Sequence, residues 1–420
     1  MADLELELLV HRVTALRWGA VTALRGGVLE VARDELTRHL LEDPRLAGVE
    51  LELVAPGDSC RLAPIFDVVE PRAKLGDGVD FPGVLGPATG AGQGQTVVLR
   101  GAAVVVLDPA GRASGQNWVL DLIGPAAELS RYGTTHNLVL VPRTVPDLDR
   151  LAQLGALRTA VLRAAVYLAR AARDAEPTAR EAYALGPVAD STLPRVAYVY
   201  QVHSHQYPTQ PGEPVLYGDN VRHLLPTALH PNEVLDGAVV RNYRAIGMET
   251  YSIQNHPVIL DLYRRHGRAL TFAGVVVTVA HNTLGERERA VTMAANLAAY
   301  TLRADGVVLT KAGGGAPHVD MAQVAHRLEG LGVRTTLLAW ELSSPGTAEE
   351  GGALFNYPDL DAIVNYGSTG FPYTLPAVER LVVGRDELRT QLAGPLEVDV
   401  LSICGAMDQL GAGHLTAATY

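Results

Sequence analysis

The spacing of hydrophobic residues differs between the two halves of this chain. In the first 140 residues, short β-rich runs lie between Gly, Pro and Asp and predict strands at 4–10, 28–31, 49–54, 97–107 and 138–141. Residues 81–96 are rich in glycine and proline and predict a loop. Residues 151–172 repeat Leu, Val and Ala at helical spacing and predict a helix.

The second half alternates apolar strands with helices. Strands are predicted at 195–202, 274–279, 306–310, 334–340 and 362–365, with helices at 286–303 and 319–331. Strands that alternate with helices predict a doubly wound, mostly parallel sheet. The proline-containing stretch 174–193 reads as a linker, so we expect two domains. The predicted fold class is α/β, with a β-rich N-terminal domain at 1–175 and a doubly wound α/β domain at 194–420.

Composition narrows the classes of function. The 420 residues carry a net charge of -11, which argues against nucleic acid and anionic membranes as partners. No apolar run is long enough for a membrane span, and the acidic N-terminus lacks a signal-peptide pattern. Two cysteines, Cys60 and Cys404, without CxxC spacing favour a reducing compartment. We expect a soluble cytoplasmic protein, and we read both cysteines as packing residues.

Polar residues collect where the predicted parallel strands end, which is where open α/β sheets bind ligands. Lys311, one of only two lysines, could anchor a substrate or act as an amine nucleophile. Glu341 could serve as a general base or bind a substrate ammonium group, although a helix cap or a strand end would also explain it. The other candidates at this edge are His281, Gly313, Gly314, Gly315, His318, Gly367, Ser368 and Thr369.

The glycine run 313–315 has two open readings. Its backbone N–H groups could cradle an anion at the start of the next helix, or it could form a tight turn that needs positive φ. It matches neither the dinucleotide nor the nucleotide-triphosphate motif.

A pair of histidines follows the predicted strand 195–202. His203 and His205 would point to one side if the strand continued, and such a pair can bind a divalent metal, with His281 and His318 as further ligands. With thirteen histidines in the chain, one close pair is expected by chance, so solvated or hydrogen-bonded loop histidines are the alternative.

Ordered motifs along nearly the whole chain resemble one family. They are PGDSCRLAPIFDVVEPR at 56–72, FPGV at 81–84, RGAAVV at 100–105, HNLVLV at 136–141, LPTALHPNEVLDGAVV at 225–240, QNHPVILDLYRRHG at 254–267, FAGVVVT at 272–278 and LGAGHLTA at 410–417. They resemble the substrate-processing subunit of component B of the glycine, sarcosine and betaine reductases, which is related to D-proline reductase.

The resemblance implies a mechanism and partners. In that family a cysteine is the site of self-cleavage into two chains and becomes a pyruvoyl group, whose carbonyl condenses with the amine of a small substrate. A separate subunit that bears a thiol or a selenol then completes a reductive cleavage. The resemblance therefore implies a small amine or amino-acid-like substrate, an oligomeric complex and an obligate partner subunit.

This chain departs from the family at the processing segment. Residues 238–257 contain no cysteine, and Asn242 and Tyr243 stand near the family's Asn-Cys pair. A tyrosine hydroxyl is not on the β-carbon, so Tyr243 cannot start the acyl shift. Thr250 and Ser252 are nearby hydroxyls but are out of register. We therefore predict that the pyruvoyl group is absent.

Three hypotheses follow. The first is a pyruvoyl-lacking reductase subunit that binds a small amine at the strand edge, with Asn242 and Tyr243 at the altered centre and His281, Lys311 and Glu341 as catalytic groups. The second is a metal-dependent hydrolase or lyase that uses His203 and His205, with Glu341 as base. The third is a non-catalytic scaffold that stabilises the reductase partner.

Overall fold

The chain folds into a mixture of helices and sheets, which confirms the expected α/β class. The computed structural model describes residues 4–202, 224–241, 248–280, 284–312, 315–341, 360–407 and 409–411. In these stretches no helix is both long enough and apolar enough to cross a membrane.

Two four-stranded sheets form the frame of the N-terminal half. One has the order β13 (Ala179–Tyr183), β1 (Leu6–Arg12), β9 (Gly94–Arg100), β8 (Arg72–Lys74). The other has the order β5 (Leu46–Val54), β12 (His136–Thr144), β10 (Ala102–Leu107), β7 (Ile65–Val69). The predicted helix is α3 (Arg150–Arg170), which packs its Leu, Val and Ala side chains against strands of both sheets.

Smaller elements complete this half. Strands β2 (Ala15–Trp18), β3 (Ala23–Arg25) and β4 (Val28–Val31) form a separate sheet beside α1 (Arg33–Leu40). β6 (Cys60–Ala63) pairs with β11 (Leu120–Asp121), which leads into α2 (Gly124–Leu129).

A six-stranded sheet organises the second half of the chain. Its order is β15 (Thr227–Leu229), β16 (Thr271–Val279), β14 (Arg195–Val202), β17 (Gly306–Thr310), β18 (Arg334–Glu341), β19 (Ala362–Ser368). Only β15 is antiparallel to its neighbour. Continuous apolar strands such as β16 fit this arrangement, because helices cover both faces of a parallel sheet.

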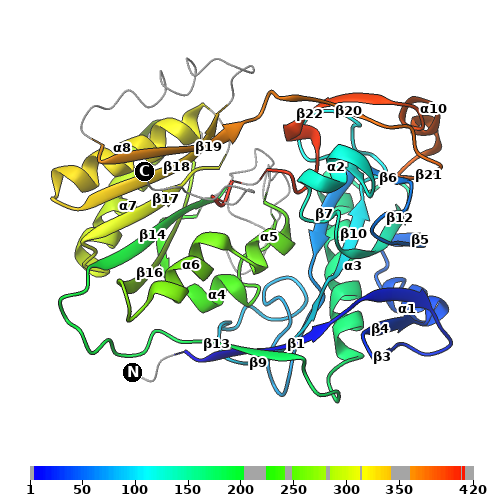
Figure 1. The fold of residues 1–420 in the computed structure, drawn as a ribbon, viewed down its shortest axis with the longest axis horizontal. Coiled ribbons are helices and arrows are strands. Elements are labelled where there is room, and N and C mark those ends of the chain that lie inside the picture. Colours follow the sequence, from blue (N-terminus) through cyan, green and yellow to red (C-terminus); the bar gives the residue numbers. More distant parts are fainter. Residues whose placement is uncertain are drawn as a thin grey trace.

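Helices lie on both faces of this sheet. Tyr198 and Tyr200 of β14 point into a core with residues of α4 (Pro231–Leu235), α5 (Thr250–Gln254) and α6 (Pro257–Arg265). Ala197 and Val199, one residue out of phase, point into a core with α7 (Leu284–Asn296) and α8 (Ala316–Gly330). α7 continues as a π-helical turn, η1 (Leu297–Thr301). Figure 1 shows α7 and α8 on the side of the sheet away from α4 and α6.

The end of the chain returns to the N-terminal half. After β19 come β20 (Pro372–Leu375), β21 (Arg380–Val383), η2 (Asp386–Leu388), α10 (Arg389–Leu392), β22 (Leu396–Asp399) and η3 (Val400–Ser402). β21 pairs in parallel with β6, so residues about 320 positions apart become neighbours. In Figure 1 these orange and red elements lie beside α2 and β6.

The proposed division into 1–175 and 194–420 stays a prediction. The stretch expected to be a linker contains β13, which pairs antiparallel with β1. Leu6 and Leu8 of β1 share one core with Val234 and Ile259 of the second half. The described residues thus join the two stretches by the pairing of β21 with β6 and by a common core.

Candidate functional site

The six-stranded sheet has one topological switch point. The chain passes from β14 to β16 on one side and then returns to β17 on the other side of β14. In open parallel sheets, ligands bind beyond the carboxyl ends of the strands at such a point. The candidate site is therefore the edge where β14 and β17 end, at Gln201–Val202 and Thr310–Ala312.

Gln201 is buried at this edge with half of its amide unsatisfied. Its Oε1 accepts a hydrogen bond from the backbone N–H of Ala312 at 2.9 Å, which fixes the orientation of the amide. Its Nε2 then has no hydrogen-bond partner among the described residues, although the side chain is only 1 % exposed. A buried unsatisfied donor costs about 1–3 kcal/mol, a cost that an oxygen atom of a ligand would remove.

Lys311 lies in line with Gln201, one residue beyond the paired Tyr200 and Thr310. It is fully buried, and its Nζ lies 3.8 Å from the centre of the Trp340 ring on β18. The ring face favours a cationic Nζ, whereas burial favours a neutral one. Burial holds the pKa of Lys311 well below its ordinary value.

His318 of α8 is the second predicted residue at this edge. It is fully buried, and burial together with the nearby Lys311 lowers its pKa to about 3. The imidazole is therefore neutral at physiological pH. The indole Nε1 of Trp340 is buried and has no hydrogen-bond partner among the described residues.

A buried hydrogen-bonded chain lies behind the edge on the opposite face of the sheet. The Tyr198 hydroxyl lies 2.5 Å from Thr310 Oγ1 and 3.2 Å from His256 Nε2, so it links β14, β17 and α6. Burial lowers the pKa of His256 to about 3, which keeps that imidazole neutral as well. These side-chain contacts connect the two paired strands at the switch point to the start of α6.

The remaining predicted residues that the structure describes lie on α8, β18 and β19. Gly315 precedes α8 with φ 68°, the positive value expected of a glycine turn. Glu341 ends β18, where its backbone pairs with Ser368 of β19. Gly367 donates its N–H to Asn365 Oδ1 at 2.9 Å, and Thr369 is 5 % exposed. Lys311 and His318 thus come together, and Glu341 comes next to Ser368.

Seven predicted site residues lie outside the described residues, namely His203, His205, Asn242, Tyr243, His281, Gly313 and Gly314. Their roles stay predictions, as does the metal-dependent hydrolase or lyase hypothesis. Within the described part of the chain, no group of three or more His, Cys, Asp or Glu could hold a metal ion.

The described flanks of residues 242–247 are anchored in a buried polar network. Arg241 donates its N–H to Thr250 Oγ1 at 3.1 Å, which ties the two flanks together. Thr250 in turn donates from its hydroxyl and its N–H to Asp67 of β7, at 2.7 and 2.9 Å. Burial raises the pKa of Asp67, and the Arg241 charge opposes that shift. Glu249 accepts from Asn117 at 2.7 Å and from the Tyr132 hydroxyl at 3.2 Å.

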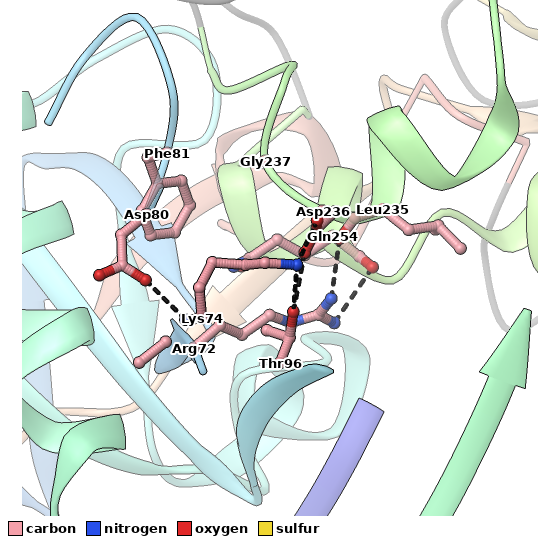
Figure 2. A pocket seen from close by; sticks show the side chains of 10 residues that line it. Arg72, Lys74, Asp80, Phe81, Thr96, Leu235, Asp236, Gly237 and Gln254 are labelled. Carbon is pink, nitrogen blue, oxygen red and sulfur yellow. Dashed lines mark hydrogen bonds and ion pairs between the residues drawn. The ribbon is translucent and has the colours of Figure 1, made fainter. Parts of the chain in front are cut away.

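A small pocket lies where α4 meets β8, as Figure 2 shows. Lys74 Nζ reaches across it to Asp236 Oδ2 at 2.7 Å and also donates to Thr96 Oγ1 and the carbonyl of Gln93. Asp236 is therefore half of a buried ion pair. The pocket holds about 10 Å³, room for roughly one water molecule, so it is structural.

A larger cavity of about 450 Å³ lies between β13 and α6. Its charged lining belongs to an ion-pair network, in which Glu70 accepts from Arg72 at 2.6 Å and from Arg100 at 2.8 Å. The buried Glu70 carboxylate is paired with two arginines. This cavity therefore leaves fewer fully buried polar groups without hydrogen bonds than the strand edge does.

Neither cysteine is built for nucleophilic chemistry. Both lie in the core, and burial raises the pKa of each thiol. The neighbouring Arg61 does not activate Cys60, because its guanidinium makes an ion pair with Asp121. Arg380 is the arginine that contacts the Cys60 sulfur, at 3.5 Å.

Sequence reasoning missed Gln201 and Trp340. The predicted candidates follow the predicted strands, whereas these two lie within β14 and β18, one residue before each strand ends. The signal available was a polar residue and a tryptophan that end otherwise apolar strands, YVYQV and TLLAW.

Comparison with known proteins extends over almost all of the chain. Residues 4–409 match the family model described as glycine/sarcosine/betaine reductase component B subunits. The glycine reductase complex component B subunits alpha and beta of Acetoanaerobium sticklandii are 32% identical over 96% of this chain and 97% of that protein. The sarcosine reductase complex component B subunit alpha of Peptoclostridium acidaminophilum is 31% identical, with 93% and 92% covered.

The betaine reductase complex component B subunit alpha of the same organism is 33% identical over 80% of this chain and 78% of that protein. No solved structure matches this chain. The match over nearly the full length shows that this chain belongs to the family of glycine/sarcosine/betaine reductase component B subunits.

Proposed function

We propose that this protein is the substrate-binding subunit of a reductase complex and that it works as one uncleaved chain without a pyruvoyl group. It holds a small amine-containing, amino-acid-like substrate at the edge between β14 and β17. A partner subunit that bears a thiol or a selenol then cleaves a carbon–heteroatom bond reductively. The observation that carries this proposal is the buried row of Gln201 and Lys311 at the switch point of a family member.

The substrate class follows from the polar groups at the edge. The names of the relatives mention glycine, sarcosine and betaine, which are small nitrogen compounds that carry a carboxylate. A carboxylate supplies the acceptor oxygens that Gln201 Nε2 and Trp340 Nε1 lack. The same oxygens would account for two buried donors that no described group satisfies.

We infer the uncleaved state because no side chain near the processing segment is suited to start self-cleavage. Residues 238–257 contain no cysteine, and Tyr243 cannot replace one. Thr250 is held by Asp67 and Arg241 in α5, and the Ser252 hydroxyl lies 3.0 Å from the Tyr132 hydroxyl. Helical backbone and occupied hydroxyls leave neither residue free to attack the preceding carbonyl.

The processing part of the proposal is tested by mass and by carbonyl labelling. We expect purified protein to show one species of 44.7 kDa under denaturing conditions and no reaction with a hydrazide probe. The Asn242→Ala variant is the control and should behave identically. Two fragments in the wild type, with hydrazide labelling of one and loss of cleavage in the variant, would overturn this part.

The binding part is tested with glycine, sarcosine and betaine as probes in thermal shift and calorimetry. One of these probes should bind the wild type. Gln201→Leu should raise its dissociation constant at least about tenfold, which is roughly 1.4 kcal/mol, because a buried donor is lost. The control is Gln95→Leu, which removes an exposed amide that bonds Glu7 at 2.6 Å. Equal affinities in the two variants would place the substrate elsewhere.

A further inference from the structure

The cavity of about 450 Å³ between β13 and α6 has the size of a small-molecule site and is walled by both halves of the chain. Leu8 of β1 and Tyr183 of β13 line it from one half, and Leu260 and Tyr263 of α6 line it from the other. None of the described residues that end β14 and β17 at the switch point lines it. The cavity is therefore separate from the proposed substrate edge.

One wall of the cavity is aromatic. The rings of Tyr183 and Tyr263 lie with their centres 5.2 Å apart. Both hydroxyls are engaged, because Tyr183 donates to Glu181 Oε2 at 3.1 Å and Tyr263 donates to Asn232 Oδ1. The rings and the neighbouring leucines therefore present apolar surface, which suits an apolar or aromatic part of a ligand.

Arg100 of β9 presents hydrogen-bond donors to the same cavity. Its Nε donates to Glu70 Oε1 at 2.8 Å, whereas its Nη2 lies 3.6 Å from Glu181 Oε2, too far for a hydrogen bond. Neither Nη1 nor Nη2 donates to any described residue, and the side chain is 37 % exposed. By contrast, each guanidinium nitrogen of Arg72 donates to Glu70 or to the carbonyl of Leu235. The end of the Arg100 guanidinium thus matches a carboxylate that accepts two parallel hydrogen bonds.

Glu181 of β13 places an acceptor next to these donors. Its backbone pairs with Leu8 of β1, and β9 lies on the other side of β1, so Glu181 and Arg100 reach the cavity from the two neighbours of one strand. Glu181 Oε2 accepts from Tyr183, and Oε1 accepts from no described residue. A carboxylate beside a guanidinium matches the ammonium and carboxylate groups that one carbon atom joins in an α-amino acid.

We propose that this cavity binds a free α-amino acid with an apolar or aromatic side chain. Its carboxylate accepts hydrogen bonds from Arg100 Nη1 and Nη2, and its ammonium group donates to Glu181. Its side chain packs against the two tyrosine rings and the leucines. This binding site goes beyond the proposed function, because it lies away from the substrate edge and needs no reductase partner.

The test is calorimetry on the full-length protein with L-phenylalanine as the probe. The comparison ligands are 3-phenylpropanoate, which lacks the ammonium group, and 2-phenylethylamine, which lacks the carboxylate. We expect phenylalanine to bind with a dissociation constant below about 1 mM and each comparison ligand to bind at least about tenfold more weakly. No saturable binding of phenylalanine, or equal affinity for either comparison ligand, would overturn the proposal.

Variants of the two charged residues assign the contacts. Glu181→Gln should raise the dissociation constant of phenylalanine at least about tenfold and that of 3-phenylpropanoate less than about threefold, because only phenylalanine has an ammonium group. Arg100→Gln should weaken the binding of both ligands. The matched control is Glu7→Gln, which changes a carboxylate of the same sheet that pairs with Arg180 at 3.2 Å and does not line the cavity.

The Glu181→Gln variant keeps the proposal testable even if Arg100→Gln does not fold after Glu70 loses a partner. Equal affinities for phenylalanine in Glu181→Gln and Glu7→Gln would show that Glu181 does not hold the ammonium group and would overturn the proposal.

Gln201→Leu separates this cavity from the proposed substrate edge. It should leave the affinity for phenylalanine unchanged, because Gln201 does not line the cavity. A tenfold weaker binding of phenylalanine in Gln201→Leu would place the amino acid at the strand edge. That result would overturn the cavity proposal and would support the proposed function.

Discussion

Arg61 places a full positive charge in the interior of the N-terminal half. It makes two hydrogen bonds to the Asp121 carboxylate, each 2.8 Å long, and both side chains are fully buried. Its remaining N–H groups donate to the backbone carbonyls of Leu392, Gly394 and Pro376. Every donor direction is used, which is the condition for a buried ion pair to be tolerated.

Asp121→Asn should lower the free energy of unfolding by about 3–5 kcal/mol, because it leaves the Arg61 charge buried and uncompensated. Chemical denaturation measures this loss. The matched control is Glu30→Gln, which breaks the exposed pair with Arg17 and should cost less than about 1 kcal/mol. Similar losses in the two variants would contradict this account of Arg61.

His256 and His318 make stability depend on pH. Both have a folded-state pKa of about 3, below the ordinary value of 6.5, so the unfolded chain binds more protons between these values. Their contribution to the free energy of unfolding is complete above pH 6.5 and is lost as the pH falls towards 3. We expect a loss of up to about 1.4 kcal/mol per pH unit for each histidine.

Denaturation at several pH values between 6.5 and 5, where exposed carboxylates stay ionised, measures this slope. His256→Gln should reduce the slope, because one of the two buried imidazoles is gone. His39→Gln removes a partly exposed histidine and is the comparison variant. A slope that is the same in all three proteins would exclude buried histidines as its source.

At the residue scale, the sequence shows which residue types are scarce but not which residues bond to one another. Lys311 stood out because the chain has two lysines, and the position of the residue at a strand end was readable. The orientation of the Gln201 amide, which leaves its Nε2 without a described partner, is set by the backbone N–H of Ala312, 111 residues later. Such a contact between distant segments leaves no local pattern.

At the element scale, Gly101 divides one apolar run into two strands of different sheets. It has φ 93°, and a Cβ at this position would lie 2.6 Å from the carbonyl oxygen of Val13. The run 97–107 predicted a single strand because its residues are apolar on both sides of this glycine. The sheet change needs a tertiary contact with Val13, which local sequence does not show.

Gly101→Ala should destabilise the protein more than Gly94→Ala. Both glycines have positive φ, which costs an alanine about 1–2 kcal/mol, but a Cβ at Gly94 meets nothing within 4 Å. The difference between the two unfolding free energies therefore measures the clash with Val13. Equal losses would show that backbone conformation, and not the close approach, requires the glycine.

The helices α3, α7 and α8 and the parallel strands of the six-stranded sheet were predictable, because hydrophobic period is a local property. α3 and β14 match their predicted ranges within two residues, and β16, β17 and β18 lie where apolar runs placed them. β13 was missed, because the strand AREAY is largely exposed and has no apolar face. Its partner β1 determines its conformation.

At the scale of the whole molecule, the two halves depend on each other. β21 pairs with β6, and Thr250 of α5 binds Asp67 of β7. The charged residues of the motif at 56–72 owe their burial to these contacts: Arg61, Asp67 and Arg72 all bond residues of the second half. The motif was recognisable from sequence, but its physical role was not.

We expect the fragment 1–193, expressed alone, to lack a cooperative unfolding transition, because it buries Arg61, Asp67 and Arg72 without their partners. Circular dichroism during heating measures this. The full-length chain is the reference and should unfold cooperatively. A fragment that melts as sharply as the whole chain would support two independent domains with the boundary between 175 and 194.

The pairing of β21 with β6 of the N-terminal half has a consequence for how the cell makes this protein. Arg61 and the carbonyl of Leu392 are 331 positions apart, so the guanidinium leaves the ribosome long before its acceptor is synthesised. Until translation is nearly complete, the nascent N-terminal half exposes the β6 edge and a charge that cannot yet be enclosed. Chaperones that shield unfinished sheets should therefore bind ribosome-attached chains that stop before β21 and release those that extend past it.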